Sequence, residues 1–194
     1  MESKIDYSIM KVGFDDIDGI INIFRNCFPY SFKWNAPRFL LRKQWTLLLQ
    51  SGSIEVYIIK IDNEIAAFYE LVIDIPLFKD IGKKEKHLLL FLSYPYVAVF
   101  HPKCIIPAIK KLIRENKYIR SNKSSNETAG NIDVIKMAWG EYQGVHSKYR
   151  GMGLSKIMQR HILNRCVTLG KNIIGCINEP NNVPVVNLHK SFGY

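Results

Sequence analysis

Up to about residue 75, the hydrophobic positions of the chain follow two spacings, one helical and one strand-like. Apolar residues from Ile17 to Phe28 recur every three or four positions, the spacing of a helix that buries one face. β-branched and aromatic residues fill two later runs on either side of the polar turn 62–64, which is typical of a hairpin. The predicted elements, in order, are a strand over 7–12, helices over 15–28 and 35–50, and strands over 54–61 and 65–73.

A regular pattern returns only near residue 132. From there the sequence predicts a strand over 132–145, a helix over 154–169, a strand over 171–177 and a helix over 182–192. The intervening segment, about 77–130, fits this order less well, and we interpret it as an insertion. It contains an apolar, aromatic stretch and a predicted helix over about 107–117, and it ends in a polar run over 120–131 that predicts a loop.

Composition is that of one globular domain over 1–194 that carries this insertion. Of the 194 residues, 47% are hydrophobic and 23% are charged, which excludes a disordered chain. The longest apolar stretch, 88–100, is interrupted by Ser93 and Pro95, so we expect no transmembrane helix. The first residues lack the pattern of a secretory signal.

The cysteines favour neither a disulfide framework nor a zinc site. Cys27, Cys104, Cys166 and Cys176 show no CxxC spacing and no close pairing with histidine. We therefore expect a cytoplasmic protein without a metal.

A net charge of +10 suggests an anionic partner. The insertion holds 11 of the Lys and Arg residues and only four Asp and Glu. One interpretation is an acceptor pocket lined by the aromatic residues Phe78, Phe91, Tyr94, Tyr96 and Phe100. Another is contact with a membrane surface through the lysines, and a third is a solvated basic face. No RNA-binding aromatic signature accompanies the charge, which argues against nucleic acid.

The run from Val145 to Ser155 points to the chemistry of the chain. A predicted strand passes through a tight turn that contains Gly151 and Gly153 and opens directly into an amphipathic helix. Such a turn directs several backbone N–H groups one way, and the helix dipole adds positive potential there. Because glycine has no side chain, a phosphate can approach the backbone closely. The pattern indicates a pyrophosphate cradle without a Walker lysine or a GxGxxG motif.

This run resembles the acyl-CoA signature of the GNAT superfamily of N-acyltransferases, V-x-P-x-[FY]-[RQ]-x-x-G-x-[GA]. Val145, Tyr149, Arg150 and Gly153 are in register, while Ser147 replaces the proline and Ser155 the last small residue. A second family pattern, N-x-x-[AS]-x-x-L-Y-x-x-x-G-[FY], matches at Asn182, Leu188, Gly193 and Tyr194. His189 occupies the tyrosine position of that pattern, and Val185 the small one.

The resemblance implies a mixed α/β (α+β) fold. Its central sheet would be mostly antiparallel, flanked by helices, and splayed between the long strand and the parallel strand that follows. The family usually has two further strands after the last helix, and these appear absent here. The alternatives are a truncated sequence, strands supplied by another chain, or a sheet that ends early, and the exposed edge of such a sheet makes a homodimer plausible.

The resemblance also implies acetyl-CoA as co-substrate. Backbone groups of Gln143, Gly144 and Val145 would pair with the pantetheine arm, and Asn182 would bind its amide region. The pyrophosphate would be held by backbone N–H groups of Gly151, Met152, Gly153, Leu154, Ser155 and Lys156, with Arg150 beside it.

Chemistry in this family is direct attack of an amine on the thioester. Glu141 is the candidate base, and strand alternation predicts that it shares a face with Gln143 while Tyr142, a reserve acid, points to the other. His189 would protonate or hydrogen-bond the departing thiolate in place of the tyrosine. An exposed glutamate and a surface histidine without catalytic roles are the alternatives.

The implied function is therefore transfer of an acetyl group to a primary amine of a small molecule or a peptide. Two alternatives remain open at this point. One is a CoA-binding regulatory module without catalysis, because His189 departs from the family pattern. The other is a basic adaptor that binds an anionic surface through the insertion.

Overall fold

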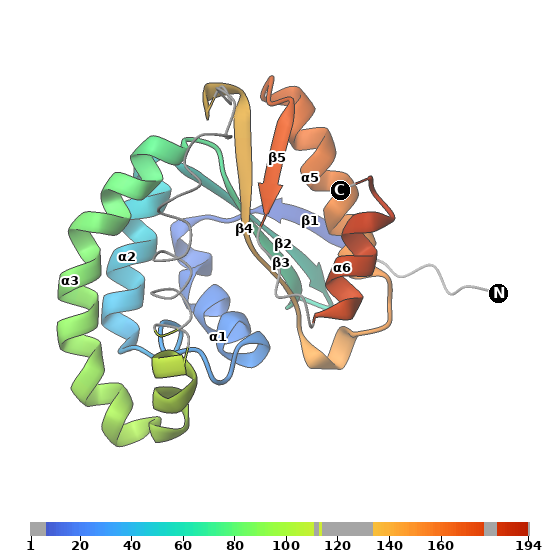
Figure 1. Cartoon of the computed structure of the whole chain (residues 1–194). Coiled ribbons are helices and arrows are strands. Elements are labelled where there is room, and N and C mark those ends of the chain that lie inside the picture. The colour runs from blue at the N-terminus through green and yellow to red at the C-terminus, as the bar shows by residue number, and fades with distance from the viewer. Residues whose placement is uncertain (1–6, 111–112, 114–133, 177–181, 194) are drawn as a thin grey trace.

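A five-stranded sheet organises the fold (Figure 1). The computed structural model describes residues 7–110, 113, 134–176 and 182–193. In sheet order the strands are β1 (Ser8–Lys11), β2 (Ile54–Ile61), β3 (Glu64–Val72), β4 (Met137–Val145) and β5 (Ile173–Cys176). Neighbouring strands are antiparallel except β4 and β5, which are parallel. This arrangement confirms the mixed, mostly antiparallel sheet expected from the sequence.

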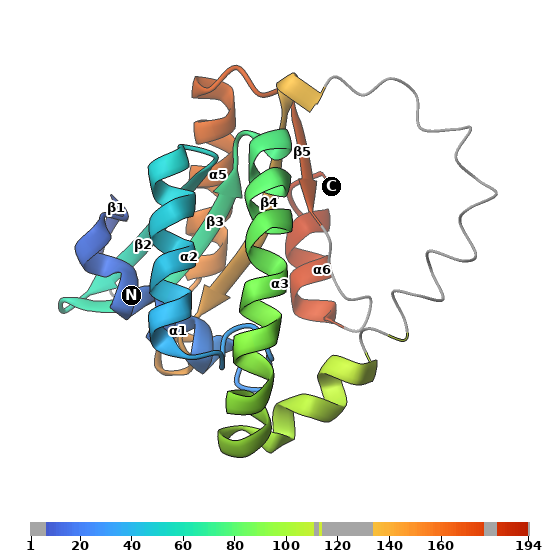
Figure 2. The same cartoon turned by 90° about the vertical axis from the view of Figure 1, so that its left-hand side faces the viewer.

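Helices cover both faces of the sheet (Figures 1 and 2). On one side lie α1 (Ile17–Cys27), α2 (Arg38–Ser51) and α3 (Ile75–Phe100), and on the other lie α5 (Leu154–Thr168) and α6 (Val183–Lys190). The helices predicted over 15–28, 35–50, 154–169 and 182–192 are therefore confirmed to within a few residues.

Each face of the sheet has its own hydrophobic core. On the side of α1 and α2, the ring centre of Phe24 lies 3.9 Å from that of Trp34 and 4.0 Å from that of Phe68. The ring centres of Trp34 and Trp45 are 6.0 Å apart. On the side of α5, the core includes Tyr69 and Leu71 of β3 and Met158 of α5. The alternation of side chains along β3 supplies both cores, since successive residues point to opposite faces.

The insertion differs most from the sequence-based expectation, because its first part is one long helix. α3 begins at Ile75, where the side chain of Asp74 accepts a hydrogen bond from the N–H of Leu77 at 2.9 Å. Pro76 lies in the first helical turn, where its missing N–H costs nothing. The helix also continues through Pro95. This helix was not predicted, because the apolar, aromatic stretch has weak helical periodicity and is interrupted by Pro95.

Parts of the insertion and of the later strands lie outside the described residues. Helical structure is described over 105–110 and at 113, whereas the rest of the helix predicted over 107–117 and the loop predicted over 120–131 are not described. The strand predicted over 132–145 begins at Met137, after a short 3-10 turn over Val134–Lys136. In the described ranges, no helix combines the length and hydropathy needed to cross a bilayer.

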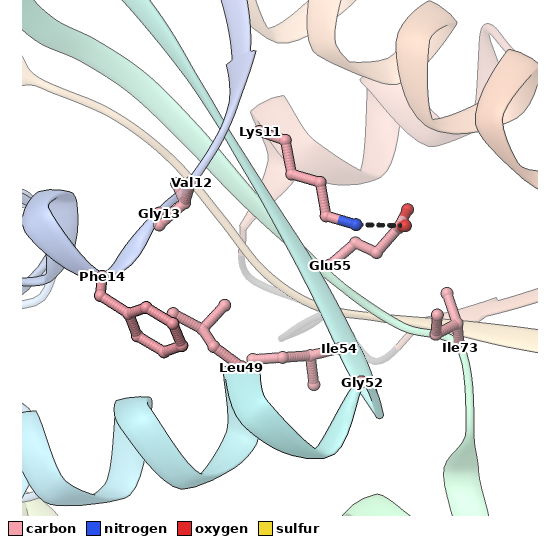
Figure 3. A pocket seen from close by; sticks show the side chains of 9 residues that line it. All are labelled: Lys11, Val12, Gly13, Phe14, Leu49, Gly52, Ile54, Glu55 and Ile73. Carbon is pink, nitrogen blue, oxygen red and sulfur yellow. Dashed lines mark hydrogen bonds and ion pairs between the residues drawn. The ribbon is translucent and has the colours of Figure 1, made fainter.

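A hollow of about 230 Å³ lies at the β1–β2 edge, but its charged groups are already paired (Figure 3). Lys11 Nζ lies 2.8 Å from Glu55 Oε1, and the guanidinium of Arg165 in α5 donates a hydrogen bond to each carboxylate oxygen of Glu55 at 2.7 Å. These contacts hold the pKa of Glu55 down to about 2, chiefly through the hydrogen bonds from Arg165. We assign this cluster to stability: it fastens the last turns of α5 to β2.

Candidate functional site

β4 is longer than its pairing with β5. Their register runs from Met137 opposite Ile173 to Gly140 opposite Cys176. β4 then continues to Val145 and keeps its other partner, β3, as far as Ala67. Gln143, Gly144 and Val145 therefore lie beyond the last β4–β5 pair, and among the described residues no strand pairs with them on the β5 side.

A β-bulge at Glu141 follows directly after the last residue of β4 that pairs with β5. Glu70 is opposite Tyr142 and Leu71 is opposite Gly140, so Glu141 is an extra residue without a partner on β3. A bulge of this kind bends its strand and shifts the alternation of side chains by one position.

The bulge overturns the prediction that Glu141 and Gln143 share a face. Glu141 Oε2 accepts a hydrogen bond from Trp139 Nε1 at 3.1 Å on the α1–α3 side of the sheet. Tyr142 lies on this same side, with its ring 5.2 Å from that of Trp34. Gln143 points the other way, and its Nε2 donates to the carbonyl oxygen of Ser155 at 3.3 Å. The predicted placement of Tyr142 opposite Glu141 was therefore wrong as well.

Glu141 lines a cavity of about 420 Å³ between α3 and β4. The other lining residues are mostly apolar: Val72, Ile75, Phe78, Lys79, Met137 and Trp139. Of the aromatic residues expected to line an acceptor pocket, Phe78 lines this cavity. Phe91, Tyr94 and Phe100 instead face outward from the far end of α3, with exposed fractions of 79%, 56% and 66%. Tyr96 packs against Phe100 with ring centres 4.9 Å apart.

The predicted cradle has the backbone that its two glycines allow. Gly151 and Gly153 have φ of 85° and 77°, a region that residues with side chains rarely adopt. A Cβ built on either glycine would meet nothing within 4 Å, so the space above them is open. The carbonyl of Gly153 accepts the N–H groups of Lys156 and Ile157 as α5 begins. In the described part of the chain, no group accepts the N–H groups from 151 to 155. The cradle thus presents open donors at the positive end of the α5 dipole.

Buried contacts hold this turn in place. Tyr149 is buried, and its hydroxyl donates to Glu64 Oε2 at 2.5 Å. Leu154 is buried under the first turn of α5. The Gln143–Ser155 hydrogen bond ties that turn to the part of β4 that extends beyond β5. Arg150, Met152 and Lys156 remain exposed at the surface around the cradle.

His189 lies near the end of β5, on the other side of the sheet from Glu141. It is 9% exposed on α6, and its Nδ1 lies 3.4 Å from Sγ of Cys176, the residue paired with Gly140. Burial lowers the pKa of His189, which favours the neutral imidazole rather than the imidazolium. Asn182 is exposed just before α6, where its carbonyl accepts the N–H groups of Val185 and Val186.

Glu70 is a buried carboxylate near the candidate site that was not predicted from the sequence. This β3 residue is 2% exposed, faces the same side as Phe68, and is paired in register with Tyr142. Its Oε2 has no hydrogen-bond partner among the described residues. Burial raises its pKa to about 7, helped by the charge of Glu141 and opposed by that of Lys33. The only signal in the sequence was a carboxylate at an inward position of an apolar strand.

Known proteins resemble this chain in structure but not in sequence. Comparison with family models finds no match, and comparison with curated proteins finds none. An aminoglycoside N-acetyltransferase, AAC(6')-Iy, solved with CoA, superposes with a TM-score of 0.58 at 10% identity, over 97% of this chain and 88% of that one. An N-acetyltransferase from Staphylococcus aureus Mu50 gives 0.59 at 10% identity, over 96% and 82%. The ribosomal-protein-S18-alanine N-acetyltransferase from Escherichia coli gives 0.56 at 12% identity, over 97% and 77%. The long β4, its bulge and the glycine cradle thus belong to a chain that has the fold of the GNAT acetyltransferases.

Proposed function

We propose that this protein is an N-acetyltransferase that moves the acetyl group of acetyl-CoA to a primary amine by direct attack within one ternary complex. The observation that carries the proposal is the connection between three features. The open glycine cradle is tied through Gln143 and Ser155 to the part of β4 that extends beyond β5, and that part begins at the bulge that bears Glu141.

The residues present fit acetyl-CoA as a co-substrate. The donors from Gly151 to Ser155, with Lys156 beside them, suit a pyrophosphate, and exposed Arg150 adds positive charge. The backbone of Gln143, Gly144 and Val145 offers an edge to which an extended amide chain can add as a strand does. Asn182 lies at the N-terminal end of α6 and would bind the same chain. Acetyl-CoA supplies an acyl group activated as a thioester.

Glu141 would take a proton from the acceptor. An amine is an ammonium ion near neutral pH and must lose a proton before it can attack. The Trp139 N–H occupies one carboxylate oxygen and fixes its orientation, and the cavity beside it gives an acceptor room to approach. Glu70 adds a second carboxylate on this face, and its raised pKa means that it is partly protonated near pH 7.

His189 would assist the leaving thiolate from the opposite face. As a neutral imidazole it still carries one N–H donor, so it can hydrogen-bond a thiolate without first being protonated. Of the two roles expected from the sequence, protonating the thiolate or hydrogen-bonding it, the lowered pKa of His189 favours the hydrogen bond.

The test combines calorimetry with acetyl-CoA and a thiol-release assay over a panel of amines. We expect acetyl-CoA to bind and at least one amine to be turned over. Glu141→Gln keeps an acceptor for Trp139 and should lower kcat by about 100-fold or more with unchanged acetyl-CoA affinity. Asp80→Asn, which removes an exposed charge from α3, is the matched control and should leave kcat unchanged. Binding without turnover of any amine would favour the regulatory module instead, and no binding would refute the cradle.

A further inference from the structure

The far end of the insertion carries an exposed apolar surface that the proposed function does not use. The apolar residues of this surface lie on the last turns of α3 and on the helical segment over 105–110, which extend beyond the ends of α1 and α2 (Figure 2). We call this surface the apolar ridge and define it by Phe91, Tyr94, Val99, Phe100, Ile106 and Ile109. Their exposed fractions range from 48% for Ile109 to 79% for Phe91.

The fold does not need these side chains in order to pack. Ser93 and Val97 of α3 and Cys104 just after it are buried, so the segment is already anchored through its other side. Cys104 reaches back to the loop after α1, with Sγ 3.4 Å from Asn35 Nδ2. Phe91 and Val99 are eight positions apart and so lie along one stripe of the helix, with Pro95 between them. Exposed apolar side chains gathered at one end of a folded protein mark an interaction site.

The charged residues next to the ridge in the sequence are of one sign. The sequence contains no Asp or Glu between Glu85 and Glu115, while exposed Lys103 and Lys110 lie next to ridge residues. Apolar and aromatic side chains bordered by lysines suit the boundary between acyl chains and anionic headgroups, where the apolar groups enter the bilayer and the ammonium groups meet phosphates.

We propose that the apolar ridge docks the protein on an anionic lipid surface. A second copy of the chain fits this surface less well, because two ridges face to face would bring together like charges with no carboxylate between 85 and 115 to offset them. The proposal is independent of acetyl transfer and adds a location at which the site would work.

Co-sedimentation with vesicles tests this directly. The full chain should bind vesicles of phosphatidylcholine mixed with phosphatidylglycerol, should bind pure phosphatidylcholine much less, and should be released by salt. The double substitution Phe91→Ser and Ile109→Ser should weaken binding by at least about ten-fold, because two apolar side chains leave the membrane boundary. Lys103→Glu with Lys110→Glu should also weaken binding to the anionic vesicles.

Val167→Ser is the matched control. Val167 is 77% exposed on α5, almost as much as Phe91, but lies outside the ridge, so its loss should not change binding. Circular dichroism checks that each variant is folded. The proposal is overturned if no vesicle is bound, or if the ridge double variant binds as the unchanged chain does. It is equally overturned if light scattering without lipid shows a dimer that the ridge substitutions dissociate, since a second copy then covers the surface.

Discussion

Two glycines at the two ends of α5 allow the cradle to be tested against a matched control. Gly153 precedes the helix with φ of 77°, and Gly170 follows it with φ of 66°. Neither has an atom within 4 Å of the position that a Cβ would occupy. Alanine at either position therefore meets the same backbone strain and no steric clash within the protein.

The expected cost to stability is the same for Gly153→Ala and Gly170→Ala. A residue with a Cβ in the left-handed region costs about 1–2 kcal/mol. For a chain of this length, that corresponds to a fall in the melting temperature of about 2–8 °C. Differential scanning fluorimetry of both variants measures this shift.

Binding of acetyl-CoA should separate the two variants. In Gly153→Ala the new methyl group points into the open space above the cradle, where it would hold a phosphate away from the backbone donors. Loss of one or two hydrogen bonds to a charged group, at about 1.5–3 kcal/mol each, raises Kd by about ten-fold to several hundred-fold or more. In Gly170→Ala the affinity should not change, because this residue lies at the opposite end of α5.

Calorimetric titration with acetyl-CoA, well below both melting temperatures, decides the question. An acetyl-CoA affinity unchanged in both variants would refute the cradle, and so would the same loss of affinity in both. A loss confined to Gly153→Ala could not arise from instability, since Gly170→Ala has the same strain.

Three further predictions concern the surroundings of the site. Gly175→Ala should destabilise the protein by about 1–3 kcal/mol and lower kcat, because its Cβ would meet the Trp139 ring at 2.6 Å and push aside the indole that orients the base; urea unfolding and thiol release measure the two effects. The depressed pKa of Glu55 means that its ion pair with Arg165 stabilises the fold above about pH 4.5 and is lost as the pH falls towards 2, so Glu55→Gln should show a lower urea midpoint at pH 6 and a flatter pH dependence over that window. His189→Ala should lower kcat by about ten-fold or more while His189→Tyr retains activity, and the unchanged chain should show no fall in kcat as the pH rises from 6.5 to 8, since the neutral imidazole is the working form.

Much of the fold could be predicted because its signals are local. The hairpin of β2 and β3 follows from β-branched runs around a polar turn, and α5 follows from its apolar spacing and the glycines at its ends. α3 could not be predicted in the same way. Pro76 and Pro95 resemble breaks in the sequence, and only the surrounding structure determines that a helix accommodates both.

The candidate site also has a part with local sequence signals, which could be predicted, and a part that depends on strand pairing, which could not. The cradle from Gly151 to Lys156 is a local motif, and its backbone has the conformation that the glycines predicted. The orientation of Glu141 depends on the pairing of β4 with β3, which lies some 70 residues earlier in the chain. A bulge is a property of two strands together, so alternation within one strand misplaced both Glu141 and Tyr142. Glu70 was missed for the same reason, since only the pairing brings it beside Tyr142.

The bulge also separates two parts of β4 that evolution can change independently. Met137 and Trp139, which precede it, line the cavity, whereas Gln143 to Val145, which follow it, lie at the edge beside the cradle. Substitutions before the bulge can reshape the cavity without altering the edge, because the strand changes phase between them. In the proposed acetyltransferase, changes in the first half of β4 would therefore alter which acceptor fits, while the second half would stay constrained by acetyl-CoA.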